Sequence, residues 1–310
     1  MTKHPPIEST DAQKAFRDEL IAHKLLIPCG VDGLYGRGKE FERVIEGFDC
    51  LITASAQDDG AEMLRFPPVI NRRDFEISGF LKSFPHLAGS VFSFEGDHAG
   101  HMNMLNRIDK EGDWTEFQKM TDVVLAPAAC YPVYPMIRGA LPRLGRLFDV
   151  ASYCFRHEPS GDPARMQMFR MREFVHVGEP QTVQSWRDVW VERGKKLLES
   201  VGLGAFSAPA ADPFFGRGGK LLAMNQIDQK LKFELLFPIT SDEKPTAIMS
   251  FNYHQEHFGS LFDIRTSTGD VAHTACLGFG MERIALALFK THGFSPAKWR
   301  NSVRDKLWPA

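Results

Sequence analysis

The strongest constraint on the fold is a pair of alternating runs, residues 150–158 and 166–177, that flank a cluster of turn formers. Within each run successive side chains point to opposite faces, as they do in a β-strand. The Pro-Ser-Gly-Asp-Pro-Ala sequence at 159–164 between them is a dense turn signal. The region therefore predicts an antiparallel hairpin with a long loop.

Several side chains with chemical potential share faces of this hairpin. Arg156 and Glu158 lie together on the first strand, Arg165 lies in the loop, and Phe169 and Glu173 share one face of the second strand. The planar guanidinium group of arginine suits phosphate oxygens, and a carboxylate accepts hydrogen bonds from an amine. A mutual salt bridge within the charged set of Arg156, Glu158 and Arg165, and a core position for Phe169, are the structural alternatives.

The C-terminal part of the chain adds further strands and one clear helix. Alternating or apolar runs predict strands at 232–237, 246–253 and 271–277, and a helix at 281–290 follows Gly278-Phe279-Gly280. Strands that pair through hairpins predict an α+β fold, a mostly antiparallel sheet flanked by helices. Arg283 falls in the first turn of that helix, where the helix dipole favours an anion, so a bound anion or a solvent-facing side chain would account for it.

The N-terminal part reads as a mixed α/β region. Its hydrophobic spacing predicts helices at 11–26, 40–47 and 73–84 and a strand at 50–54. We expect an N-terminal α/β portion, residues 1–110, packed on a core formed by residues 111–310.

Composition excludes several classes of protein. The 37 Lys and Arg residues nearly balance 39 Asp and Glu residues, so the chain lacks the basic excess of a protein that clamps a polyanion. Neither a secretory leader nor a run of about 18 apolar residues is present. Five cysteines without a Cys-x-x-Cys pair predict reduced thiols and a cytoplasmic protein.

Two motifs resemble those of class II aminoacyl-tRNA synthetases. Residues 155–158, with Arg165 and Phe169, resemble their motif 2, and residues 278–283 resemble their motif 3. Over about 110–310 the chain is similar to the catalytic core of the methanogen-type, zinc-dependent seryl enzymes. It resembles still more closely the small stand-alone amino acid:[carrier protein] ligases.

This resemblance implies an ATP site and an amino acid site. Arg156 and Arg283 would be catalytic, and Glu173 and Asn252 would contact the amino acid. Magnesium is expected with the ATP phosphates, but Ala247 stands where the seryl enzymes carry an acidic ligand, which leaves the magnesium ligands open. The implied ATP-binding residues are Arg156, Glu158, Arg165, Met166, Phe169, Lys232, Ala247, Ser250 and Arg283.

The resemblance also implies a zinc ion held by Cys130, Glu173 and Cys276, with the fourth position open to the substrate amine or water. Spacing alone does not select these residues. Cys29 and Cys50 would be buried structural thiols. The rival ligands are Cys154, His157, His176, His254 and His273.

The family likeness predicts an enzyme that activates glycine or alanine as the adenylate. The aminoacyl group would pass to the phosphopantetheine thiol of a small acidic carrier protein. A tRNA acceptor is the first alternative, although the helical hairpin, anticodon module and basic surplus of the seryl enzymes are missing. A catalytically inactive regulatory module is the second.

Two further expectations concern partners. A homodimer would form through motif 1, a helix and strand around residues 113–132. No membrane contact is expected. The basic docking patch for the carrier would come from Arg138, Arg143 and Arg146, or from Lys195 and Lys196.

Overall fold

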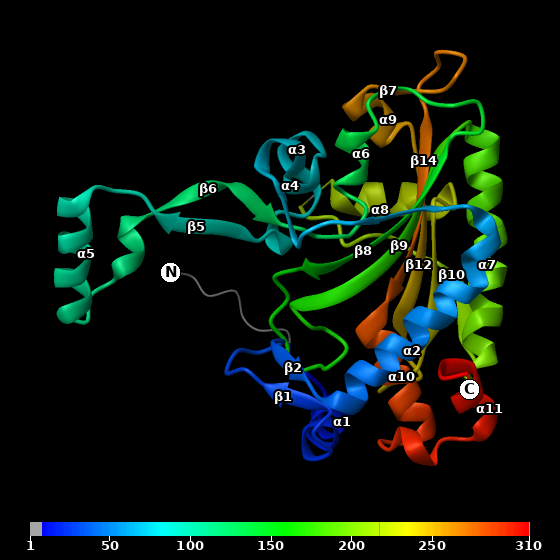
Figure 1. Cartoon of the computed structure of the whole chain (residues 1–310), viewed down its shortest axis with the longest axis horizontal. Coiled ribbons are helices and arrows are strands. Elements are labelled where there is room, and N and C mark those ends of the chain that lie inside the picture. The colour runs from blue at the N-terminus through cyan, green and yellow to red at the C-terminus, as the bar shows by residue number, and fades with distance from the viewer. Residues whose placement is uncertain (1–7, 217, 310) are drawn as a thin grey trace.

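The computed structural model describes residues 8–216 and 218–309, and residues 1–7, on which the expectation about a secretory leader rests, lie outside them. A seven-stranded sheet forms the centre in the order β10-β11-β12-β14-β9-β8-β3, and β3 with β8 is its one parallel pair (Figure 1). The predicted antiparallel sheet is therefore confirmed. Its strands are β3 Glu62–Arg65, β8 Arg146–Phe155, β9 Met168–Gly178, β10 Phe206–Pro209, β11 Lys232–Phe237, β12 Thr246–Gln255 and β14 His273–Gly280.

The predicted hairpin is β8 and β9. The first strand ends at Phe155, so the prediction that Arg156 and Glu158 lie on it is wrong, and both lie in the loop that follows. Phe155 pairs with Met168 at the loop end, and Val150 pairs with Glu173 farther along. Glu173 and Met171 face a cavity, while Arg172 faces the opposite side, where it binds Asp149 and Asp49. The period-two pattern therefore assigned the faces of β9 correctly.

Helices cover one face of the sheet along most of its length. These are α2 (Lys39–Ala56), α7 (Pro180–Ser200) and α10 (Met281–His292), with α11 (Asn301–Leu307) beside α2 (Figure 1). Phe174, Leu277 and Phe279 of the sheet belong to the apolar core that these helices complete. Burial of such side chains is the main force that holds α2 and α10 on the sheet.

The other face is covered by shorter elements. Helices α6 (Val133–Met136) and α9 (His257–Phe262) pack at one end of the sheet, where Tyr134 stacks on Phe258 with ring centroids 3.9 Å apart. The short strands β7 (Gly139–Ala140) and β13 (Ile264–Arg265) pair beside them. This partial cover leaves the rest of the face available for a cavity.

The predicted strand at 50–54 is wrong, because these residues continue α2. Phe41, Val44, Phe48 and Ile52 recur at helical spacing and are all buried. This apolar stripe outweighs the local β propensity of the Cys-Leu-Ile-Thr sequence. Cys50 lies on the opposite side of the helix and is exposed, and Cys29 is exposed too, so the prediction that both are buried is also wrong.

Two other helix predictions need shorter bounds. The first helix, α1, ends at Ala22 and is followed by a hairpin of β1 (Leu26–Pro28) and β2 (Tyr35–Arg37). The region 73–84 splits into α3 (Arg72–Ile77) and α4 (Phe80–Ser83), because Gly79 between them takes a φ of 78°. A left-handed residue of this kind ends a helix.

An arm extends from the body in Figure 1. It contains β5 (Ser90–Phe94), α5 (His98–Asp109) and β6 (Gln118–Leu125), and β4 (Val69–Asn71) pairs with the base of β6. Within 113–132, β6 follows a 3₁₀ turn, Trp114–Phe117, where a helix was expected. The pairs β3 with β8 and β4 with β6 join the N-terminal portion to the core, and the division at residue 110 remains a prediction.

None of the helices in the described ranges has both the length and the apolar character needed to cross a membrane. The longest, α7, carries charged residues along its length.

Candidate functional site

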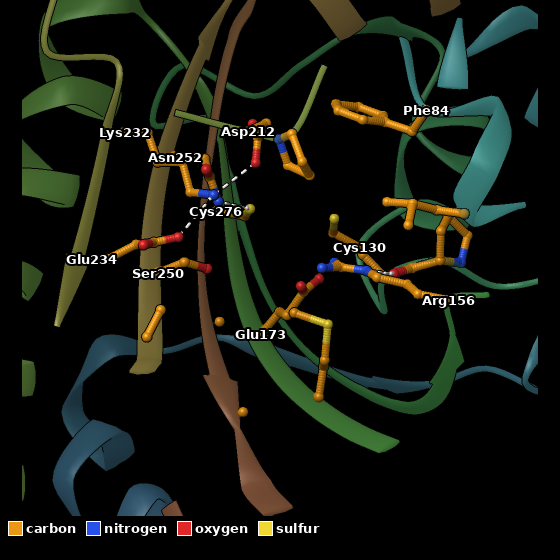
Figure 2. Close-up of a pocket in the computed structure, with 18 of the residues that line it drawn as sticks. Phe84, Cys130, Arg156, Glu173, Asp212, Lys232, Glu234, Ser250, Asn252 and Cys276 are labelled. Carbon is orange, nitrogen blue, oxygen red and sulfur yellow. Dashed lines mark hydrogen bonds and ion pairs between the residues drawn. The ribbon is translucent and has the colours of Figure 1, made fainter. Parts of the chain in front are cut away.

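A cavity of about 410 Å³ lies on the open face of the sheet. Its floor is formed by β9, β11, β12 and β14, and its walls include α4, the loop that follows β6, and α8 (Gly219–Asp228). Figure 2 shows side chains from these elements converging on it. The cavity brings together most of the residues singled out in the sequence.

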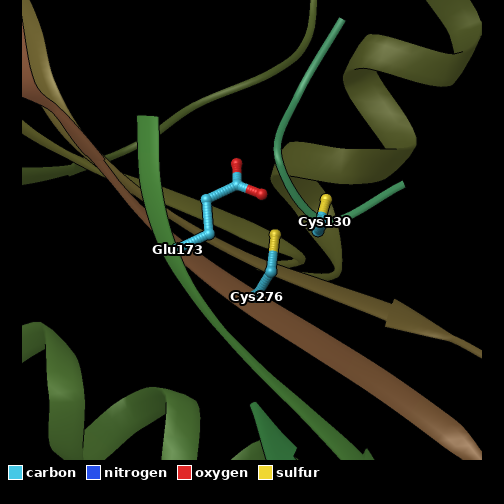
Figure 3. Close-up of side chains that lie close together, drawn as sticks. All are labelled: Cys130, Glu173 and Cys276. Carbon is cyan, nitrogen blue, oxygen red and sulfur yellow. The ribbon is translucent and has the colours of Figure 1, made fainter. Parts of the chain in front are cut away.

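At one end lie Cys130, Glu173 and Cys276, which point toward one another (Figure 3). Their sulfur and carboxylate atoms all lie within 4.8 Å of one another, and all three residues are buried. Glu173 and Cys276 come from adjacent strands, since Glu173 pairs with Gly278, and Cys130 comes from the loop before α6. The predicted triad is thus assembled, and it is the one such donor group among the described residues.

Burial determines the charge of this cluster. It raises the pKa of Glu173 to about 8, and the Cys276 sulfur adds to the shift. Hydrogen bonding between the two sulfurs raises the pKa of Cys130 and lowers that of Cys276. Oε2 of Glu173 is buried without a hydrogen-bond partner among the described residues.

These properties fit a metal ion. Two thiolates and one carboxylate are ligands that Zn²⁺ prefers, and three protein ligands leave one position open. A cation would also satisfy the buried carboxylate oxygen that has no partner. The rival ligands Cys154, His157, His176 and His273 lie outside this donor group, and His254 contacts it through Cys276.

Gly278 keeps the floor open beside the triad. It pairs with Glu173 on one side and with Ser250 on the other. A Cβ atom at this position would lie 3.3 Å from Glu173 Oε1 and 3.1 Å from Met171 Cε. The glycine therefore leaves room for a ligand between the triad and β12.

Two arginines mark the other part of the cavity. Arg156 Nε donates to the Pro127 carbonyl (3.1 Å), and its guanidinium lies 5.5 Å from the centre of the Phe169 ring. Arg283 donates to the carbonyls of Ala164 (2.8 Å) and Ala247 (3.0 Å). Within residues 8–216 and 218–309, neither forms a salt bridge.

Charges of both signs surround Arg283, with Glu158 and Glu234 as the nearby carboxylates. Burial lowers the pKa of Arg283, and the charges of Arg156 and Arg165 lower it further. Buried cations without a carboxylate partner are costly unless an anion joins them. This part of the cavity is therefore built for an anionic ligand.

The remaining predicted nucleotide residues lie nearby with one exception. Glu158, Met166, Phe169, Ala247 and Ser250 line the cavity, whereas Arg165 does not. Arg165 reaches Glu158 through an ion pair of 2.6 Å. A salt bridge within the charged set is therefore present, but it joins Glu158 to Arg165 and does not include Arg156.

Lys232 lies between two carboxylates, and the sequence interpretation identified neither of them. Its ammonium lies 2.6 Å from Asp212 and 3.0 Å from Glu234, as Figure 2 shows. Burial lowers the pKa of Lys232, but the two carboxylates outweigh it and raise the pKa overall. Glu234 was detectable, because it alternates with Lys232 on one strand face. Asp212 lies in a coil and gave no such signal.

The segment before α8, residues 212–215, forms one side of the cavity. Phe214 stacks on Phe84 with centroids 5.2 Å apart, and the Phe215 amide donates to the Ser83 carbonyl. Gln226 of α8 donates to Asp212 and accepts from its amide. The N-terminal portion thus supplies part of the cavity wall through α4.

Comparisons with known proteins agree with this geometry. Amino acid–[acyl-carrier-protein] ligase 1 of Bradyrhizobium diazoefficiens is 47% identical over 303 residues, which cover 96% of this chain and 93% of that protein. Ligase 2 of the same organism is 46% identical over 304 residues, covering 97% and 90%. No protein-family model matches the chain.

Comparison with solved structures identifies the fold. Methanopyrus kandleri seryl-tRNA synthetase, crystallised with an Aquifex aeolicus tRNA, superposes with a TM-score of 0.80 at 19% identity. The match covers 99% of this chain and 62% of that one, so the chain spans less than two thirds of the seryl enzyme. The fold is that of a class II aminoacyl-tRNA synthetase catalytic core, and the sequence places the chain in the amino acid–[acyl-carrier-protein] ligase family.

Proposed function

We propose that the protein activates a small amino acid with ATP and transfers it to the phosphopantetheine thiol of an acidic carrier protein. One observation carries this proposal. Two half-buried arginines without carboxylate partners among the described residues lie in the same cavity as a buried donor triad of two sulfurs and a carboxylate. The first group suits a triphosphate, and the second suits a metal that selects a free amine.

In the proposed activation step, a carboxylate oxygen of the amino acid attacks the α-phosphorus of ATP. The bond to the β-phosphate oxygen breaks, and magnesium diphosphate leaves. Arg156 would hold the α-phosphate, and Arg283 and Arg165 the outer phosphates. Fixed donors that face the developing charge supply most of the catalysis in such a step.

The adenine would lie between Phe169 and Arg283, with Glu158 accepting from its amino group. Met166, Ala247 and Ser250 line the same part of the cavity, which supports a nucleotide pocket there. Lys232 would exchange a carboxylate partner for a phosphate or carboxylate oxygen of the substrates.

The amino acid would bind at the triad, beside Glu173 and Asn252. Zn²⁺, when bound by Cys130, Glu173 and Cys276, would supply a Lewis-acidic position for the amine. Tyr131, Asn252 and His254 also line the cavity, and glycine or alanine is the proposed substrate.

In the proposed transfer step, the carrier thiolate attacks the carbonyl carbon of the adenylate and AMP leaves. Of the candidate docking residues, Arg138, Arg146 and Lys195 have acidic neighbours, namely Asp74, Glu62 and Glu199. Arg143 and Lys196 complete the two proposed patches. We further propose that the protein forms a homodimer and that it is cytoplasmic. The five free thiols are consistent with a reducing compartment such as the cytoplasm.

Amino-acid-dependent exchange of labelled diphosphate into ATP tests the activation step. We expect exchange with glycine or alanine and much less with serine. Absence of exchange with every small amino acid, in protein shown to contain zinc, would contradict an enzyme and favour the inactive regulatory module.

The acceptor is tested separately. Carrier protein bearing phosphopantetheine and total tRNA are offered in parallel reactions with the labelled amino acid. We expect label on the carrier protein, and none on a carrier whose phosphopantetheine serine is replaced by alanine. Label on tRNA alone would favour the synthetase alternative.

A further inference from the structure

A β-bulge in β12 lies beside the donor triad. The pairing of β12 with β14 shifts register between Tyr253 and Gln255, and Gln255 takes a φ of 52°. A bulge inserts one unpaired residue and re-aims its side chain. Here the inserted residue is His254, which lines the cavity.

His254 bridges a triad cysteine and a buried hydroxyl. Its Nε2 lies 3.6 Å from Cys276 Sγ, and its Nδ1 lies 3.0 Å from Thr274 Oγ1. Thr274 is completely buried. The ring also packs edge-on against Tyr134 and Phe258, which restrict its orientation.

A neutral imidazole can complete both contacts with its proton on Nε2. A neutral ring carries one N–H, so one nitrogen donates and the other accepts. The Thr274 hydroxyl can donate to Nδ1, which leaves the Nε2 proton directed at the Cys276 sulfur. Asn252 Nδ2 donates to the same sulfur at 3.5 Å, so Cys276 has a second N–H donor.

The two cysteines of the triad are therefore held differently. Cys276 is fixed on a central strand, between donors from β12, whereas Cys130 comes from the loop before α6. Groups that hydrogen-bond to a metal ligand orient it and change its donor strength. A thiolate is the form that binds a metal, and N–H donors favour that form.

We propose that His254 is a positioning residue for Cys276, donating Nε2–H to its sulfur with the ring tautomer fixed by the Thr274 hydroxyl. This inference rests on the zinc site of the proposed function. It assigns His254 to a supporting role, since its nitrogens fall outside the group of mutually close ligand atoms formed by Cys130, Glu173 and Cys276 in the described chain.

The test compares His254→Ala with His254→Gln in the full-length protein. A glutamine amide can place an N–H near the position of Nε2, whereas alanine cannot. We expect His254→Ala to weaken zinc binding by about 10- to 100-fold and His254→Gln to recover most of the loss. Affinity is measured by competition with a chromophoric zinc chelator.

Cobalt substitution gives a readout that a merely structural role would not move. An N–H donor stabilises the sulfur lone pairs, so its removal moves the thiolate-to-cobalt absorption band to longer wavelength. We expect this shift in His254→Ala and not in His254→Gln. His273→Gln is the matched control, because this histidine, on the neighbouring strand β14, contacts Tyr253 and not the triad.

Thr274→Val tests the tautomer. We expect it to weaken zinc binding in the wild-type background, by less than His254→Ala does, and to change nothing in the His254→Gln background, where no tautomer needs to be fixed. This pair of measurements carries the test if His254→Ala does not fold.

The outcomes separate this inference from the proposed function. Wild-type protein that binds no zinc would remove the zinc site itself. Wild-type binding with unchanged affinity and cobalt spectrum in His254→Ala would overturn only the role of His254. Failure of His254→Gln to recover binding, with a histidine nitrogen in the X-ray absorption spectrum of the bound zinc, would make His254 a ligand and overturn the inference as well.

Discussion

The two parts of the cavity differ in the charged groups that they gather. The triad part gathers a buried carboxylate and two sulfurs, and one carboxylate oxygen has no partner among the described residues. The arginine part gathers two half-buried cations that donate to backbone carbonyls. The triad part lacks a cation, and the arginine part lacks an anion. The cavity is therefore arranged for two ligands of opposite charge.

Lys232 provides an internal contrast with the arginines. It already has two carboxylate partners, Asp212 and Glu234, whereas Arg156 and Arg283 have only neutral ones. The charge of Lys232 is already balanced by its partners, whereas a cation without carboxylate partners is available to an anionic ligand. The arginines are therefore the better candidates for phosphate binding.

Removal of a triad sulfur should have the largest effect and should act on the triad part of the cavity first. Cys276→Ala should lose zinc and all measurable diphosphate exchange together, because two protein ligands rarely hold zinc. Metal content and exchange are measured on the same sample. Cys50→Ala, which removes an exposed thiol, is the control and should keep both. Full exchange in zinc-free Cys276→Ala would refute the zinc assignment.

The second prediction concerns pH and the metal-free protein. Glu173 has a folded pKa of about 8 against an ordinary 4.5. Between these values the unfolded chain loses the proton and the folded chain keeps it, so this residue lowers stability as pH rises. At 1.36 kcal/mol per pKa unit the full effect is about 4 to 5 kcal/mol.

We therefore expect metal-free Glu173→Gln to gain stability over wild type as pH rises from 5 to 8. The comparison is made at each pH, because Cys276, whose pKa is lowered, has the opposite slope. Denaturant unfolding measures the difference. Glu62→Gln is an exposed control, and a wild-type-minus-variant difference that does not change with pH would contradict the raised pKa.

The third prediction probes the arginine part. Arg156→Lys keeps the charge and removes the planar fork, so diphosphate exchange should fall by about 10²- to 10³-fold, with zinc content unchanged. Arg146→Lys, at the start of β8 and outside the cavity, should have little effect. If Arg156→Lys instead lost zinc, the two parts of the cavity would not be independent.

The smallest effect is expected at Asp212. Burial opposes ionisation there, but Lys232 and Gln226 hold the pKa of Asp212 below its ordinary value. Asp212→Asn should cost about 1 kcal/mol at pH 7, a figure reduced for the partial exposure of the carboxylate.

Because the folded pKa is lowered, this contribution is present above the ordinary value near 3.8 and is lost only as pH falls below it. The difference between Asp212→Asn and wild type should therefore be constant from pH 5 to 8, in contrast to Glu173→Gln. Denaturant unfolding at several pH values checks this, with Asp122→Asn as the exposed control. A difference that changes across this range would show that Asp212 is not ionised throughout.

Local order determined much of this protein directly from the sequence. The alternation in 150–158 and 166–177 predicted β8 and β9 and the faces of Glu173 and Arg172. The Gly-Phe-Gly sequence before 281–290 predicted the junction of β14 with α10. These features follow from side-chain periodicity and backbone sterics, which act within a few residues.

The contacts between residues far apart in the sequence depend on the tertiary structure. Cys130, Glu173 and Cys276 meet because a loop and two adjacent strands converge, and Asp212 reaches Lys232 from a coil. Residues 50–54 became helical because the apolar stripe of α2 packs into the core with α10. Burial and long-range pairing are properties of the folded chain, so only the resemblance to a family, and not the spacing of residues, could select the triad beforehand.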